Sequence, residues 1–137
     1  MTSIYKLFST EEKYEKDGVW LEFGDGLKIK IARAGGRNKQ YLKELNKLQR
    51  KYGRLIENDV LENSKADELL AEIYAKTILL DWEGITDEND KPLLFNVSNA
   101  KKILLDIPDL FILIRNESSK LTNFREQESN IEEIEKN

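Results

Sequence analysis

One polar turn contains residues with the spacing of metal ligands, but it lacks residues that a calcium-binding loop requires. Asp87, Asn89 and Lys91 alternate as the first ligands of a calcium-binding loop do. A lysine carries no oxygen that could bind the cation, and Pro92 stands where such a loop needs glycine. We therefore expect a turn at this place rather than a metal site, and we expect no cofactor elsewhere.

Paired carboxylates are the remaining groups that could carry out acid–base chemistry. Asp81 and Glu83 form one pair, and Asp106 and Asp109 form another. Both pairs lie at expected helix ends or turns, where a carboxylate commonly caps backbone N–H groups. The chain has no His and no Cys, which removes the usual proton carrier near pH 7 and the thiolate nucleophile. These residues predict a binding protein rather than an enzyme.

The composition is that of a small globular domain with a strongly charged surface. The chain has 137 residues, of which 39% are hydrophobic and 35% charged, and its net charge is −4. Five Glu against one Arg and one Lys place −3 of this charge within residues 125–137. We expect no nucleic-acid partner, because the chain as a whole lacks a basic balance. No run is long and apolar enough for a membrane span or a signal peptide, so a cytoplasmic protein is expected.

Two alternating stretches near the N-terminus predict the first folded element. Apolar and polar residues alternate in 19–23 and again in 27–31, on either side of Gly24-Asp25-Gly26. This pattern is typical of a β-hairpin, which we place at 19–32 after a lead-in at 1–17. A two-stranded hairpin is marginally stable in water, so it must pack on helices or join another sheet.

The rest of the chain shows helical periodicity up to its acidic end. Apolar residues recur at spacings of three and four, which predicts helices at about 38–56, 64–81, 98–106 and 108–119. Asn38 is the expected cap of the first of these helices. The expected fold is mainly α with a short N-terminal β-hairpin, in a single compact domain of about four to five helices over 18–124. Residues 125–137 are expected to form a flexible acidic tail, either weakly helical or disordered.

Aromatic and aliphatic residues in the second half of the chain are the candidates for partner binding. Large apolar side chains dominate both interfaces and cores, so the sequence leaves the two roles open, with the core favoured for Trp82 and Phe95. For the two isoleucines of the tail, partner contact and disorder remain equally open. The candidate residues are Trp82, Phe95, Leu110, Phe111, Phe124, Ile131 and Ile134.

The order of several short motifs resembles a known family. The motifs are Gly18 to Gly26, Lys30 to Lys39, Leu80 to Glu88, Lys91-Pro92-Leu93 with Phe95, Asn99-Ala100, Leu105 to Phe111, and Asn123-Phe124-Arg125. Together they resemble the tail assembly chaperones of long-tailed, siphovirus-type bacteriophages and their prophages, over roughly residues 18–125. The resemblance implies a protein that binds the phage tape measure protein, keeps it soluble and helps to recruit tail tube subunits.

The resemblance also implies that the protein acts in the cytoplasm of the bacterial host and is absent from the finished virion. Many such chaperones have a longer form made by a programmed frameshift, and a Glu-rich end is compatible with one. We expect a partner groove formed by the helices around Trp82 to Phe111, with the tail closing over it. The alternatives are a structural head–tail joining or tail-completion protein, and a small regulatory binding protein. The oligomeric state stays open, a homo-oligomer included.

Overall fold

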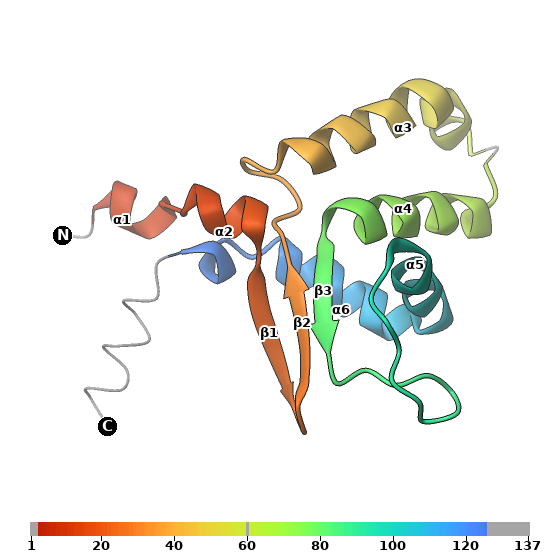
Figure 1. The fold of residues 1–137 in the computed structure, drawn as a ribbon. Coiled ribbons are helices and arrows are strands. Elements are labelled where there is room, and N and C mark those ends of the chain that lie inside the picture. The colour runs from red at the N-terminus through yellow and green to blue at the C-terminus, as the bar shows by residue number, and fades with distance from the viewer. Residues whose placement is uncertain (1–2, 60, 126–137) are drawn as a thin grey trace.

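A three-stranded antiparallel sheet lies at the centre of the molecule in the computed structural model, which describes residues 3–59 and 61–125. Its strands are β1 (Val19–Gly24), β2 (Leu27–Ile31) and β3 (Leu79–Glu83), in the order β1-β2-β3. Figure 1 shows β2 between its two neighbours, with β3 on the side of the helices that follow it. The hairpin of β1 and β2 is therefore only part of the sheet.

The expected fold class was wrong in this respect. The helix predicted over 64–81 ends at Thr77, and the next residues form β3. Ile78, Leu79 and Leu80 form a short apolar run, which suits a strand as well as a helix. Pairing with β2 decides between the two, because a third strand stabilises a hairpin that is marginal by itself.

The two faces of the sheet differ in polarity. On one face Ile29 lies opposite Trp82, and both side chains are buried. On the other face Lys30 lies between Trp20 on β1 and Asp81 on β3, and its ammonium stands 5.9 Å from the centre of the Trp20 ring. Strand residues alternate between faces, so the pattern buries one side against the helices and exposes the other to water.

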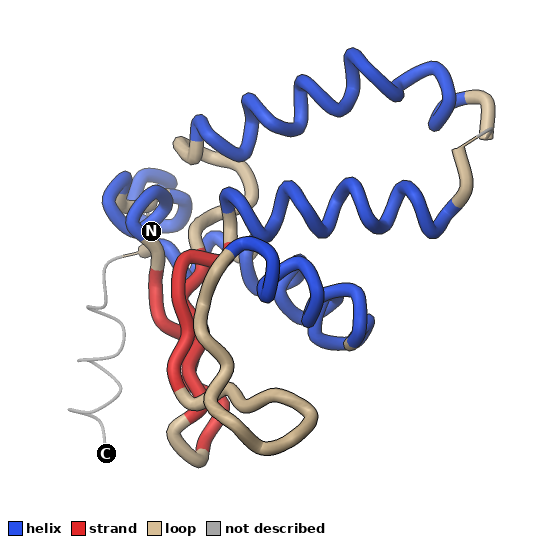
Figure 2. Tube along the Cα trace, turned by 45° about the vertical axis from the view of Figure 1, so that its right-hand side comes forward, coloured by secondary structure: helices blue, strands red, loops and turns tan. Residues whose placement is uncertain are grey.

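Helices precede β1, lie between β2 and β3 in the chain, and follow β3 (Figures 1 and 2). They are α1 (Ile4–Phe8), α2 (Glu12–Asp17), α3 (Lys39–Glu57), α4 (Asn63–Thr77), α5 (Val97–Asp106) and α6 (Pro108–Ser118), followed by the short 3-10 helix η1 (Leu121–Phe124). Residues of α4, α5 and α6 form the core with β2 and β3. In both views α3 lies beyond α4, on the side away from α5. Within residues 3–59 and 61–125, no helix has the length and apolar character needed to cross a membrane.

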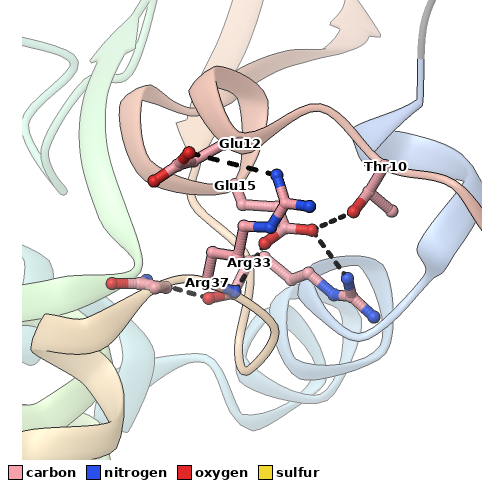
Figure 3. Close-up of polar contacts among 6 residues, drawn as sticks. Thr10, Glu12, Glu15, Arg33 and Arg37 are labelled. Carbon is pink, nitrogen blue, oxygen red and sulfur yellow. Dashed lines mark hydrogen bonds and ion pairs between the residues drawn. The ribbon is translucent and has the colours of Figure 1, made fainter.

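A buried carboxylate joins the N-terminal segment to the loop before α3 (Figure 3). Glu15 of α2 is only 1% exposed. Its oxygens accept hydrogen bonds from the Thr10 hydroxyl, from the Arg33 guanidinium at 2.9 Å and from the Arg37 backbone N–H at 2.5 Å. Burial acts to raise the pKa of Glu15, but these hydrogen bonds and the Arg33 charge outweigh it and hold the pKa below the ordinary value. The expected lead-in is thus tied to the folded domain.

Asn38 holds the start of α3 beside the end of α4. Its side-chain oxygen accepts a hydrogen bond from the backbone N–H of Tyr41 at 3.3 Å, as expected for a helix cap. Its amide group donates to the backbone oxygens of Arg33, at 2.8 Å, and of Thr77, at 3.2 Å. The side chain is 5% exposed, so these bonds are shielded from water. Asn38 therefore fixes the base of the helical hairpin formed by α3 and α4.

Replacing Asn38 by Ala is expected to lower the free energy of unfolding by about 1–2 kcal/mol, because the cap of α3 and the link to Thr77 are both lost. Urea denaturation followed by circular dichroism measures this change. Gln40→Ala, at an exposed position in the first turn of the same helix, is the matched control and should change stability little. Equal losses for the two variants would contradict the role given to Asn38.

Candidate functional site

Trp82, the first predicted binding residue, lies in the core. It is 6% exposed, and its indole N–H donates a hydrogen bond to the Leu93 backbone oxygen at 2.8 Å. The half-buried Phe95 ring meets it edge to face, with the ring centres 4.9 Å apart. Such aromatic pairs add stability beyond the apolar area they bury. These two residues attach the loop after β3 to the sheet, and Trp82 has little surface left for a partner.

The predicted residues of α6 and η1 also pack inside the molecule. Phe111 meets Tyr74 of α4 edge to face, with ring centres 5.4 Å apart, and Leu110 packs partly buried against the same core. Phe124 is fully buried, and its backbone oxygen accepts a hydrogen bond from the Glu11 N–H at 2.8 Å. The expected groove around Trp82 to Phe111 is thus largely filled by its own side chains.

The two isoleucines of the acidic tail, Ile131 and Ile134, lie outside the described residues. Their predicted role in partner contact therefore stays a prediction.

The polar turn that resembles a calcium loop is organised by its own first aspartate. The Asp87 carboxylate accepts hydrogen bonds from the backbone N–H groups of Asn89, at 2.8 Å, and Lys91, at 3.0 Å. Asp90 adopts a positive φ of 60°, as residues in tight turns do. Within residues 3–59 and 61–125 no group of three or more acidic, His or Cys side chains could hold a metal ion. The geometry here is that of an Asx turn.

Helix α3 is the long element with the least cover. Within its 19 residues, the one buried residue is Gly53. Its apolar face bears Tyr41, Leu45 and Leu48, which are half-buried, and Leu55, which is 40% exposed. An amphipathic helix normally buries such a face against the core. Within residues 3–59 and 61–125, α4 is the main element packed against this face, and the apolar side chains of α3 stay half-buried or exposed.

A groove runs between α3 and α4, and we call it the α3–α4 groove. Its volume is about 380 Å³. Four apolar side chains and five charged ones line it: Leu48, Tyr52, Leu69 and Ile73, with Glu44, Lys47, Lys51, Lys65 and Glu72. Half-buried apolar side chains between charged ones are typical of a surface that binds an amphipathic segment. Of the described surfaces, this one combines apolar side chains from two long helices.

The rim of the groove carries charges of both signs, although α3 as a whole is basic. Helix α3 contains six Lys or Arg and two Glu, which gives it a charge of +4 in a chain of net charge −4. Lys47 is paired with Glu44 at 3.6 Å. The Lys51 ammonium instead lies 5.4 Å from the centre of the Tyr52 ring. In all, three Lys and two Glu line the groove, so its rim can pair with charges of either sign.

A smaller apolar surface on α1 lacks a second element to form a groove. Ile4, Tyr5, Leu7 and Phe8 are all 45% or more exposed, and α1 contains no buried residue. A five-residue helix presents little area by itself. The α3–α4 groove, with side chains contributed by two helices, is the better candidate site.

Comparison with known families adds one decisive observation. A model of the YdaY prophage protein family matches residues 36–137, which is more than half of the chain. The chain belongs to the YdaY prophage protein family. No curated protein and no solved structure was found to match it. The match confirms that the chain is a prophage protein, as the resemblance implied. The family description names no partner.

The YdaY family match includes the whole α3–α4 groove. Helices α3 to α6 and strand β3 lie within the matched residues, whereas α1, α2, β1 and β2 precede them. The sequence showed the amphipathic face of α3 but not that α4 leaves it partly open. One feature of the sequence did indicate an exposed helix, namely the six Lys or Arg side chains of α3. A helix deep in a core contains fewer charged residues.

Proposed function

We propose that this prophage protein is a non-enzymatic tail assembly chaperone, which binds tape measure protein in the α3–α4 groove. The observation that carries the proposal is the partly uncovered apolar face of α3, a 19-residue helix whose one buried residue is a glycine. Membership in a prophage family supports a phage-derived role, and the ordered motif resemblance alone implies the class of partner. In this proposal the protein acts in the host cytoplasm and helps to recruit tail tube subunits.

The groove suits a helical partner for a geometric reason. Two antiparallel helices present ridges and grooves of side chains, and a third helix can pack between them. Leu48 and Tyr52 on α3 face Leu69 and Ile73 on α4 across the groove. A partner helix with an apolar stripe would cover these side chains and hide its own stripe from water. Shielding of this kind keeps a long helical protein from aggregating.

Co-expression with tape measure protein from the same prophage tests the proposal. We expect the two proteins to co-purify and the solubility of the tape measure protein to rise. Mass spectrometry of purified particles should then detect no copy of this chain. Failure of both co-purification and solubility rescue would overturn the chaperone proposal, and its presence in particles would favour a head–tail joining protein.

Leu48→Glu is expected to weaken binding of the tape measure protein by about tenfold or more, because a carboxylate would replace an apolar contact worth more than 1.4 kcal/mol. Isothermal titration calorimetry or quantitative pull-down measures the loss. Leu48 is half-buried on the sparsely covered helix, so the fold should persist, which circular dichroism can check.

The matched control is Leu94→Glu, which places the same change on a side chain that is 77% exposed and distant from α3 in the chain. It should bind as the unmodified protein does. If both variants bind equally well, the α3–α4 groove is not the binding site.

A further inference from the structure

Strand β1 forms an open edge of the central sheet. Within residues 3–59 and 61–125, β2 pairs with one side of β1 and no strand pairs with the other (Figure 1). Natural proteins commonly protect such an edge with lysine or proline, and β1 contains neither. It instead bears two aromatic side chains, Trp20 and Phe23, each 40% exposed. An edge of this composition is suited to pairing with a further strand.

The pairing of the sheet fixes which backbone groups of β1 point outward. The Trp82 N–H bonds to the Asp81 carboxylate at 2.8 Å, so it turns away from Ile29, which lies opposite Trp82 on β2. In an antiparallel ladder, successive residues direct their N–H and C=O groups to alternate sides of the strand. Ile29 therefore bonds to Leu21 of β1, and the residues on either side of Leu21 direct their backbone groups to the open side.

These two residues, Trp20 and Glu22, make the open edge complementary to itself. We propose that two copies of this chain pair through β1, antiparallel and about a two-fold axis at Leu21. Trp20 of each copy then lies opposite Glu22 of the other, and the two residues exchange N–H···O=C bonds. Two such exchanges join the three-stranded sheets of the copies into one continuous sheet. The interface is isologous, as is usual in homodimers.

The charges on the polar face of the sheet favour this register. The Lys30 ammonium lies 5.9 Å from the centre of the Trp20 ring. In the dimer, Glu22 of the second copy lies beside the same ring, with its carboxylate next to that ammonium. The Glu22 side chain is 73% exposed and pairs with Lys28 at 3.6 Å, so its carboxylate can accept a second cation. Opposite charges on neighbouring strands stabilise a sheet, and like charges destabilise it.

The apolar face of β1 contributes contact as well. Val19 and Leu21 pack against the core but stay half-buried. At the two-fold axis the Leu21 side chains of the two copies lie side by side, because directly opposite residues have Cβ atoms about 5 Å apart. Pairing therefore buries apolar surface together with the backbone groups of the edge.

The dimer goes beyond the proposed function and does not depend on it, because β1 contributes no residue to the α3–α4 groove. If the proposed function also holds, each dimer presents two grooves to one long tape measure protein. Two linked contacts bind more tightly than either contact does alone.

The mass of the full chain in solution is the first test. Sedimentation equilibrium should give a mass that rises with concentration from 16.0 kDa towards twice that value. A mass that stays at 16.0 kDa at every concentration would overturn the proposal.

Cysteine cross-linking tests the register, because the chain has no Cys of its own. Leu21→Cys places one thiol of each copy at the two-fold axis, where opposite Cα atoms are about 5 Å apart and a disulfide can form. Phe23→Cys is the matched control at a more exposed position. Its two copies are separated by roughly 13 Å along the strands, which is beyond the reach of a disulfide. Under mild oxidation we expect covalent dimers mainly of Leu21→Cys, and equal or reversed yields would overturn the pairing.

Charge reversal tests the ion pairs across the interface. Glu22→Lys brings a lysine beside Lys30 of the other copy at two symmetric places, and should weaken the dimer by about tenfold. Glu83→Lys is the matched control, because Glu83 flanks the same Lys28 on the opposite edge of the sheet. It should leave the dimer affinity unchanged, and circular dichroism checks that both variants fold. Equal effects of the two variants would overturn the proposal.

A mixture of two variants tests the two-fold arrangement. Lys30→Glu should weaken the dimer by itself, because the new carboxylate faces Glu22 of the other copy. Mixing Glu22→Lys chains with Lys30→Glu chains should restore the dimer, since both cross-interface pairs then join opposite charges. Absence of recovery in the mixture would contradict the register.

The partner assay separates the dimer from the proposed function. A dimer that forms and cross-links as expected, while no tape measure protein binds, would sink the chaperone proposal and leave the pairing of β1 intact. Binding of tape measure protein by a chain that is monomeric at every concentration would do the reverse.

Discussion

Replacing Trp82 by Ala will lower the free energy of unfolding by about 3–5 kcal/mol, as expected when a large buried aromatic side chain is removed. The indole is 6% exposed, bonds to the Leu93 oxygen and packs edge to face on Phe95. Its loss leaves a cavity at the junction of β3, β2 and the loop after β3. Urea denaturation followed by circular dichroism measures the change.

Trp20→Ala is the matched control, because Trp20 is the other tryptophan of the chain and also belongs to the sheet. It is 40% exposed on the polar face, so its removal should cost much less than that of Trp82. The fluorescence of each single-tryptophan variant gives a second readout: buried Trp82 should emit at shorter wavelength than Trp20. Similar stability losses for the two variants would show that Trp82 is not a core residue.

Glu15→Gln will lower the free energy of unfolding by about 2–3 kcal/mol at neutral pH, because buried donors lose a charged acceptor. Thr10 and Arg33 donate to one carboxylate oxygen, and the Arg37 N–H donates to the other. A glutamine retains only one oxygen, so it cannot satisfy both sets of donors. The ion pair of buried Glu15 with half-buried Arg33 is also broken, and the loss of one partner of a largely buried pair is costly.

The difference between Glu15→Gln and the unmodified protein will depend on pH in a defined direction. The folded-state pKa of Glu15 lies below its ordinary value of 4.5, since hydrogen bonds and Arg33 outweigh the effect of burial. The carboxylate therefore contributes full stability above pH 4.5 and loses it as the pH falls through the folded pKa. Denaturation curves at a series of pH values should show the two proteins converging below pH 4.5.

Glu12→Gln is the control on the same helix. Glu12 is exposed and pairs with Lys16 at 2.8 Å. Figure 3 shows its second pair, with Arg37 at the limit of 4.0 Å. Exposed ion pairs contribute little to stability, so this variant should follow the unmodified protein closely at neutral pH. A gap between Glu15→Gln and the unmodified protein that stays constant down to low pH would show that the charge of Glu15 is not what stabilises the fold.

Short-range features of the fold followed from the sequence. Alternation around Gly24-Asp25-Gly26 located β1 and β2, and Asn38 was recognised as the cap of α3. The helix predicted at 108–119 is α6, which begins at Pro108, a residue suited to the first turn of a helix. Each of these signals depends on the intrinsic geometry of a few neighbouring residues, which is the same in the isolated segment and in the folded chain.

The candidate site was less accessible to sequence reasoning. Trp82 and Phe111 were reasonable interface candidates by residue type, and the structure places both in the core. The apolar periodicity predicted a helix over about 38–56, and the structure adds that part of its apolar face borders the α3–α4 groove. Apolar periodicity identifies which face of a helix avoids water. It does not show whether another helix of the same chain or a partner protein packs on that face.

The sequence by itself determined the absence of His and Cys, the acidic end, the β1–β2 hairpin and the amphipathic character of α3. Only the tertiary structure decided that 79–83 pairs with β2 as a strand, that Glu15 is buried among its donors, and that the other described residues leave the apolar side chains of α3 half-buried or exposed. The physical reason is shared by all three. Each depends on contacts between residues that are far apart in the chain. Local propensities do not include the free energy of such contacts.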